Sequence, residues 1–272
     1  MGFFRILLVS LLTLPQLALA ATPGELDRLY TALRGTDLME ILSEEGRVQS
    51  EELQADMFPG RSNASWVATS SAIYDVEKMR VTFRARFNAE LTDTDVSEIL
   101  DYLESDEGKR VVNLEVDARR ALMDDAVEEA AREAFGELKI ADEARLDRLE
   151  AFVDANNLID LNVSGALNSN LSFYNGLAAG GGFELPQDEI LADIWESADE
   201  IRADATEWMF GYLTMAYEPL EDQALDTYIS LSETPSGKAL NRALFAAFDD
   251  LFRGISFDLG KAASRFTQGD DI

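Results

Sequence analysis

The spacing of apolar residues predicts a chain that is helical almost throughout. Between residues 240 and 266, apolar side chains recur every three or four positions, at Leu240, Leu244, Phe248, Leu251, Phe252, Ile255, Leu259, Ala262 and Phe266. This recurrence places one continuous apolar stripe on one face of a helix. No segment sustains the period-two alternation of a strand, and residues 79–87, which come closest, continue a helical pattern. We therefore expect an all-α protein whose helices pack as a bundle.

The same pattern predicts approximate bounds for the other helices. Long helices are expected at 63–88, 105–135 and 187–217, and short ones at 25–34, 36–45, 49–57, 92–103, 142–155, 157–163, 165–177 and 221–231. The short helices at 92–103 and 221–231 each precede a long one, so the order of elements in the first half resembles the order in the second.

Sequence similarity between the two halves predicts an internal repeat. Residues 91–110 align without a gap on residues 220–239, and the same offset places Trp66 on Trp195. An earlier block aligns at a slightly shorter offset, which brings Leu38 onto Leu158. We expect two tandem, structurally similar multi-helix units, residues 21–140 and residues 141–272, that follow a signal peptide at residues 1–20.

Each unit carries one copy of a short motif at the start of a helix. The motif residues are Ser105, Gly108 and Lys109 in the first copy, and Thr234, Pro235, Gly237 and Lys238 in the second. A Ser or Thr can cap free N–H groups, and Pro suits the first helical position. A glycine one turn into the helix allows another backbone to approach closely. We expect the motif to be structural, with each lysine lying along its helix or pairing with an acid such as Glu233. Capping of a neighbouring helix C-terminus by both lysines is a further hypothesis.

The segment SETPSGKAL at residues 232–240 resembles the signature of a secreted proteobacterial family, domain of unknown function 2059. That signature reads roughly Ser-Pro-x-Gly-x-Lys. The second copy departs from it with Thr234 in place of Ser and with Lys238 directly after Gly237, and the first copy has Asp106 in place of Pro. The resemblance implies a helical, exported protein and no particular reaction, and the internal alignment suggests that the family's unit occurs here in two tandem copies.

The N-terminal residues are typical of an export signal. Arg5 precedes an apolar run that contains Pro15 and ends in Ala-Leu-Ala at residues 18–20, a small-x-small cleavage pattern. The run is shorter than the roughly twenty residues that a spanning helix needs. We expect cleavage before Ala21, no transmembrane segment after cleavage, and a periplasmic or secreted location; an uncleaved anchor is the alternative.

Net charge narrows the range of partners. The chain has 52 acidic and 23 basic residues and a formal net charge of −29. Such a chain is repelled by nucleic acid, so we expect no nucleic-acid partner. Most of the charge is expected on solvated helix faces, and attraction to a basic partner or to divalent cations stays open.

The absence of two residue types excludes several chemistries. The sequence contains no His and no Cys. A Ser-His-Asp triad, a cysteine nucleophile and a zinc site of ordinary composition are therefore excluded. We predict no catalytic residue, cofactor or metal ligand. A hydrolase that uses Asp, Glu, Ser and Lys is the alternative, although Ser236 and Lys238 are two apart on a helix and do not face each other.

Aromatic residues of the second unit provide the last clue. The group consists of Phe173, Tyr174, Trp195, Trp208, Phe210, Tyr212 and Tyr217. It forms either the core of that unit or the wall of an apolar cavity between the units. We favour an exported, non-enzymatic binding or structural module of the cell envelope, whose partner is a protein or a small apolar ligand. The sequence predicts no oligomeric state.

Overall fold

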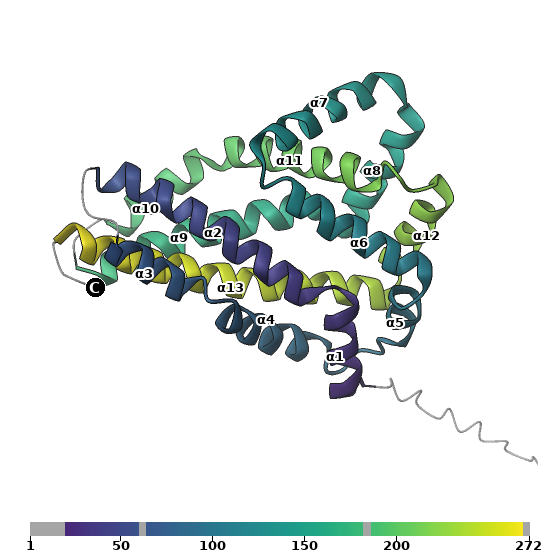
Figure 1. The fold of residues 1–272 in the computed structure, drawn as a ribbon, viewed down its shortest axis with the longest axis horizontal. Coiled ribbons are helices and arrows are strands. Elements are labelled where there is room, and N and C mark those ends of the chain that lie inside the picture. The colour runs from purple at the N-terminus through teal and green to yellow at the C-terminus, as the bar shows by residue number, and fades with distance from the viewer. Residues whose placement is uncertain (1–19, 60–63, 182–185, 269–272) are drawn as a thin grey trace, which may run out of the picture.

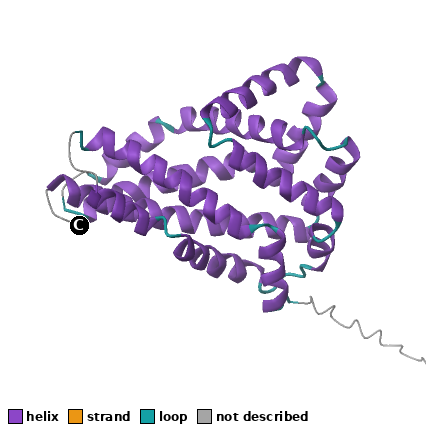
Figure 2. Cartoon of the chain, viewed as in Figure 1, coloured by secondary structure: helices purple, strands orange, loops and turns teal. Residues whose placement is uncertain are grey.

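The computed structural model describes residues 20–59, 64–181 and 186–268. The predicted signal peptide lies outside these residues except for Ala20, so its cleavage stays a prediction. The described residues form α-helices joined by short turns, without any strand, which confirms the all-α bundle (Figure 2). No helix in the described ranges has the length and apolar character needed to cross a bilayer.

Thirteen helices are present in the described part of the chain. They are α1 (Pro23–Ala32), α2 (Gly35–Met57), α3 (Ala64–Ile73), α4 (Val76–Leu91), α5 (Ser97–Leu103), α6 (Asp106–Ala121), α7 (Asp125–Ala141), α8 (Glu143–Asn156), α9 (Leu158–Ala179), α10 (Gln187–Glu196), α11 (Ala198–Tyr217), α12 (Asp222–Glu233) and α13 (Pro235–Gln268).

Most neighbouring helices pack on α13 on one side of the molecule and on α11 on the other (Figure 1). The 34-residue α13 lies against α9 along much of its length and also contacts α4 and α3. Helix α11 packs on α6, α7 and α9. The last helices of each predicted unit therefore pack on the other unit, because α13 covers α4 while α6 and α7 cover α11.

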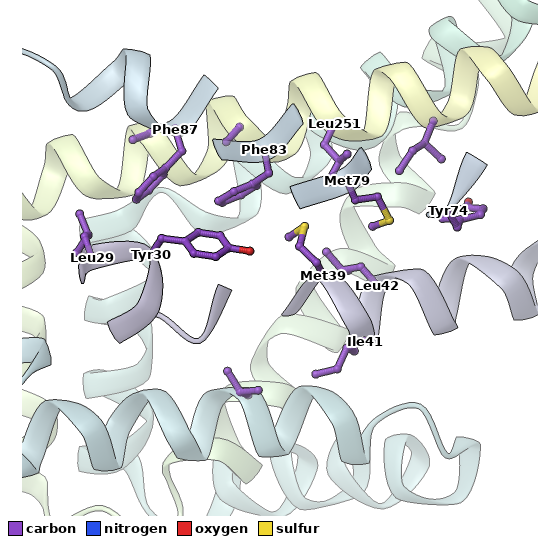
Figure 3. Close-up of a cluster of buried hydrophobic side chains, with 14 of the residues drawn as sticks. Leu29, Tyr30, Met39, Ile41, Leu42, Tyr74, Met79, Phe83, Phe87 and Leu251 are labelled. Carbon is purple, nitrogen blue, oxygen red and sulfur yellow. The ribbon is translucent and has the colours of Figure 1, made fainter. Parts of the chain in front are cut away.

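Two hydrophobic cores follow from this arrangement. The first joins α1 to α5 and part of α6 with α13, and Figure 3 shows Phe83 and Phe87 of α4 directed toward Leu29 and Tyr30 of α1. The second is built from α6, α7, α8, α11 and α12, and includes Leu149 and Leu213. Both cores draw residues from both predicted units, so the boundary at 140/141 stays a sequence prediction.

The contact between α9 and α13 depends on small residues. A Cβ added to Gly176 would lie 2.1 Å from the Phe257 carbonyl oxygen, and one added to Gly260 would lie 2.1 Å from the Phe173 carbonyl oxygen. These distances are far below van der Waals contact. The two backbones therefore touch directly, and this close approach requires glycine on both helices.

Three predicted long helices are divided in the structure. The segment 63–88 becomes α3 and α4, 105–135 becomes α6 and α7, and 187–217 becomes α10 and α11. Two of the breaks have clear capping signals. The carboxylate of Asp75 accepts a hydrogen bond from the Lys78 amide (2.9 Å), and that of Asp124 accepts one from the Ala126 amide (2.9 Å). Each aspartate starts a new helix by satisfying a free backbone donor.

The opposite difference occurs in α2 and α9, which are each one continuous helix where two short helices were predicted. Gly46 lies inside α2, and a Cβ there would meet the ring of Tyr74 at 2.0 Å. This glycine makes room for an aromatic side chain and does not end the helix. Tertiary packing outweighs its low helix propensity.

Candidate functional site

A cavity of about 820 Å³ lies between α2, α6, α9, α11 and α13. Most of its lining is apolar and includes Leu38, Leu42, Val112, Val116, Leu161, Met209, Leu213, Leu244 and Phe248. The volume falls within the range of sites that enclose small molecules, roughly 300–1,000 Å³. This cavity is the candidate functional site.

Helix α6 brings two charged residues to the cavity. Its residues Val112, Glu115, Val116 and Arg119 all line the space. Their spacing of three and four residues puts them on one face of the helix. On this face of α6, Glu115 therefore lies between two apolar residues, Val112 and Val116.

The side chain of Glu115 is held by tyrosines of α11. The Tyr217 hydroxyl donates to Oε1 of Glu115 at 2.6 Å, and the Tyr212 hydroxyl donates to its backbone carbonyl oxygen at 3.2 Å. Glu115 is part-buried because it borders the cavity. Among the described residues, no cationic side chain lies within ion-pair distance of its carboxylate. The hydrogen bond thus orients the carboxyl, but no opposite charge among the described residues pairs with it.

Removal from water dominates the acid–base behaviour of this group. Burial raises the pKa of Glu115 to about 7, although hydrogen bonds from Tyr217 and Tyr228 act to lower it. Burial, followed by the neighbouring Glu115 carboxylate, raises the pKa values of Tyr212, Tyr217 and Tyr228 well above the usual range. The phenols therefore remain donors, while the carboxyl changes charge near neutral pH.

Aromatic rings surround the carboxyl. Phe152 stacks on Tyr228 with ring centroids 5.3 Å apart, and its edge meets Tyr217 at 5.6 Å. Tyr102 stacks on the Tyr228 ring at 5.7 Å. These rings come from α5, α8, α11 and α12, so elements distant in the sequence together enclose Glu115.

Arg119, one turn after Glu115, is engaged elsewhere. One of its guanidinium nitrogens lies 2.6 Å from a carboxylate oxygen of Glu45 on α2, and its guanidinium carbon lies 4.7 Å from the ring centroid of Trp208. Burial raises the pKa of Glu45, and the Arg119 charge opposes that shift. This ion pair joins α2 to α6 and leaves Glu115 without a cation.

The aromatic group predicted from sequence is divided between several places. Trp208, Tyr212 and Tyr217 line the cavity, and they also belong to the second core or pack against it, so the core interpretation applies to them as well. The other members serve different roles: Phe210 stacks on Phe135 in the second core, Phe173 and Tyr174 pack against the first core, and Trp195 is 69% exposed. Trp195 thus differs from its predicted counterpart Trp66, which is fully buried.

The repeated motif has the same local geometry in both places. The Ser105 hydroxyl accepts a hydrogen bond from the Gly108 amide at 3.1 Å, and the Thr234 hydroxyl accepts one from the Gly237 amide at 3.0 Å. Pro235 is the first residue of α13, as expected from its preference for that position.

Both motif glycines permit a close backbone approach. A Cβ on Gly108 would lie 2.1 Å from the Tyr102 carbonyl oxygen, and one on Gly237 would lie 2.0 Å from that of Leu231. Each motif therefore closes a tight connection between a short helix and a long one. Gly237 also lines the cavity.

Of the roles expected for the two motif lysines, the described residues show neither an ion pair nor a helix cap. Lys109 and Lys238 are exposed, and within the described ranges neither amino group forms a hydrogen bond or an ion pair with another side chain or a helix end. Their long side chains extend into water at the surface of helices whose first turns are already capped. The Ser236 hydroxyl donates to Glu98 at 2.6 Å and has no contact with Lys238.

A second local similarity connects the two halves. Arg34 precedes α2 and Asn157 precedes α9, and both have a left-handed backbone with φ of 51° and 50°. Leu26 and Leu149 occupy the corresponding buried positions of the preceding helices. Both pairs are separated by 123 residues, whereas the sequence alignment that placed Leu38 on Leu158 used a separation of 120. The two registers differ by three residues, about one helical turn.

Comparison with known proteins gives one match. Residues 77–137 are similar to a bacterial family described as "Uncharacterized protein conserved in bacteria (DUF2059)". This segment runs from α4 to α7 and includes Ser105, Gly108 and Lys109, whereas the resemblance in the sequence was carried mainly by residues 232–240. The chain matches no curated protein and no solved structure.

Proposed function

We propose that this protein is a non-enzymatic binding protein of the bacterial cell envelope that holds a small apolar ligand in its central cavity. The observation that carries the proposal is the space itself, about 820 Å³ lined mainly by leucine, valine and aromatic side chains. Enclosing apolar surface of a ligand removes that surface from water, which stabilises the complex by roughly 25 cal/mol for each Å².

The proposal includes export and an internal duplication. The N-terminal sequence supports export. The duplication is supported by the matching caps of Ser105 and Thr234 and by the left-handed residues Arg34 and Asn157. In this interpretation the cavity lies where the two copies meet, because α2 and α6 line it from one copy and α9, α11 and α13 from the other.

Hydrolysis through Ser236 and Lys238 has no comparable support. The hydroxyl that would act as nucleophile donates its hydrogen bond to Glu98, and the lysine that would act as base extends into solvent. A nucleophile and its base need to be within hydrogen-bond reach.

The test is binding of a neutral fluorescent probe, N-phenyl-1-naphthylamine, to residues 21–272, with displacement by dodecanol. A matched pair of variants locates the site. Gly165 lines the cavity and Gly136 lies on α7 outside the lining, and a Cβ would meet no atom within 4 Å at either position. Gly165→Trp should weaken probe binding several-fold, and Gly136→Trp should leave it unchanged.

Two results would contradict the proposal. One is that the unmodified protein binds neither the probe nor dodecanol. The other is that Gly165→Trp binds both as tightly as Gly136→Trp does. Native mass spectrometry of protein purified from the periplasm is a complementary measurement, since a bound ligand adds mass that is lost on denaturation.

A further inference from the structure

We infer that the cavity selects an amphiphile with a cationic head, whose ammonium group pairs with Glu115 while its apolar chain fills the remaining space. This inference rests on the proposed function and adds the chemical class of the ligand.

The first step of the argument is the unmatched carboxyl. Glu115 borders an apolar space, and Arg119, the nearest cation on its own helix, pairs with Glu45 and stacks on Trp208. An ionised group away from water is unfavourable unless an opposite charge and hydrogen bonds compensate it. The protein supplies hydrogen bonds to Glu115 but no opposite charge among the described residues, so a cationic ligand would provide that charge.

The second step is the remaining capacity of that carboxylate. An ionised carboxylate offers two oxygens and about four acceptor positions. The Tyr217 hydroxyl donates to Oε1. Acceptor positions therefore remain for a donor that enters from the cavity. A protonated amine is such a donor, and a quaternary ammonium would be attracted by charge alone.

The third step concerns the walls. Phe152, Tyr212, Tyr217 and Tyr228 line the same cavity as Glu115, and Trp208, which also lines it, stacks on Tyr212 and already has the Arg119 guanidinium over its ring. Aromatic faces attract cations within about 6 Å of the ring centroid, and a carboxylate beside several rings is the combination that recognises alkylated ammonium groups. An uncharged ligand would use the rings but gain nothing from the carboxylate.

The other charged groups of the lining do not compete from inside the cavity. Asp249 accepts a hydrogen bond from Asn168 at 2.8 Å and lies 3.7 Å from the guanidinium of Arg253. Arg242 is exposed at the edge of the lining. An anionic head bound at Arg242 is the competing arrangement, and the experiment includes a probe for it.

The experiment compares three ligands with the same dodecyl chain: dodecyltrimethylammonium, dodecanol and dodecanoate. Each displaces N-phenyl-1-naphthylamine at pH 8, below its micelle concentration and at physiological ionic strength, which screens the net negative charge of the surface. We expect the cation to bind about tenfold more tightly than dodecanol, from its ion pair and cation–π contacts. In Glu115→Gln the cation should fall to the affinity of dodecanol, while dodecanol itself binds as before.

Asp249→Asn is the matched control, because it removes the same charge from the same lining at a carboxylate that already has partners. It should preserve the preference for the cation. The inference is overturned if dodecanol and the cation bind equally to the unmodified protein, if Asp249→Asn removes the preference as Glu115→Gln does, or if dodecanoate binds most tightly. Binding of dodecanol without a preference for the cation would leave the proposed function intact, whereas failure of all three ligands would overturn both.

Discussion

Tyr217 donates a 2.6 Å hydrogen bond to Oε1 of Glu115, which joins the end of α11 to the middle of α6 at the wall of the cavity. The bond orients the one carboxyl that interrupts the apolar face of α6. It also favours the ionised form of that carboxyl, against the effect of burial.

Removing this bond should shift the titration of Glu115. In Tyr217→Phe the pKa of Glu115 should rise above its present value of about 7, because the larger of the two hydrogen bonds that lower it is lost. Carbon-13 NMR of the labelled side-chain carboxyl measures this value directly. Tyr212→Phe is the control, since Tyr212 donates to the backbone carbonyl of Glu115. An unchanged pKa in Tyr217→Phe would contradict the hydrogen bond from Tyr217 to the Glu115 carboxylate.

The raised pKa of Glu115 has a consequence for stability. The carboxyl has an ordinary pKa of 4.5 when unfolded and about 7 when folded, so between these values the folded state binds more protons. Its contribution to the free energy of unfolding is therefore present at low pH and falls as pH rises through this window.

Glu115→Gln removes that dependence and should be more stable than the unmodified protein at pH 8, by about 1–3 kcal/mol, with little difference at pH 4.5. Urea denaturation at the two pH values measures this difference, and the comparison cancels the titration of the other acids. An equal effect at both pH values would mean that Glu115 does not titrate in this range.

The glycines between α9 and α13 should not tolerate a larger side chain. Gly176→Ala places a Cβ 2.1 Å from the Phe257 carbonyl oxygen, so the helices must separate. We expect a loss of about 1–3 kcal/mol of unfolding free energy, measured by denaturant unfolding. Gly254→Ala on the exposed side of α13, where a Cβ meets no atom, should instead gain up to about 1 kcal/mol. Similar effects at both sites would refute the close contact.

Because α13 packs on α4, and α6 and α7 pack on α11, we predict that neither half of the chain folds alone. The Phe83 ring of α4 packs on Phe248 of α13 with centroids 4.8 Å apart, so residues 21–140 lack the helix that covers α4. We expect this fragment to give poorly dispersed NMR spectra and no cooperative unfolding. Mixing it with residues 141–272 should restore both signals. A cooperative transition in the isolated fragment would contradict the prediction.

Sequence periodicity predicted the helical class because stripes such as the one from Leu240 to Phe266 are long and regular. Helix ends were predicted less well. Asp75 and Asp124 look like ordinary surface acids until their carboxylates are seen to accept backbone bonds at 2.9 Å. Gly46 resembles a helix end in the sequence, and only the position of the Tyr74 ring explains it.

Part of the candidate site could be predicted and part could not. Trp208, Tyr212 and Tyr217 were recognised as possible walls of a cavity because aromatic residues cluster there in the sequence. Glu115 was missed, since it is one of 52 acidic residues. The available signal was its place between Val112 and Val116 on an apolar face. The helices that form the rest of the cavity wall are distant from α6 in the sequence, so the pattern of α6 alone did not identify the site.

The position of α13 also sets the order in which this chain can fold. Leu251 and Phe248 belong to the last helix, yet they complete the core that α1 to α4 begin. As the chain leaves the ribosome, helices α1 to α4 emerge first and lack α13 as a partner until its residues follow. Closure of the first core is thus a late, long-range event, which slows folding compared with local helix pairing.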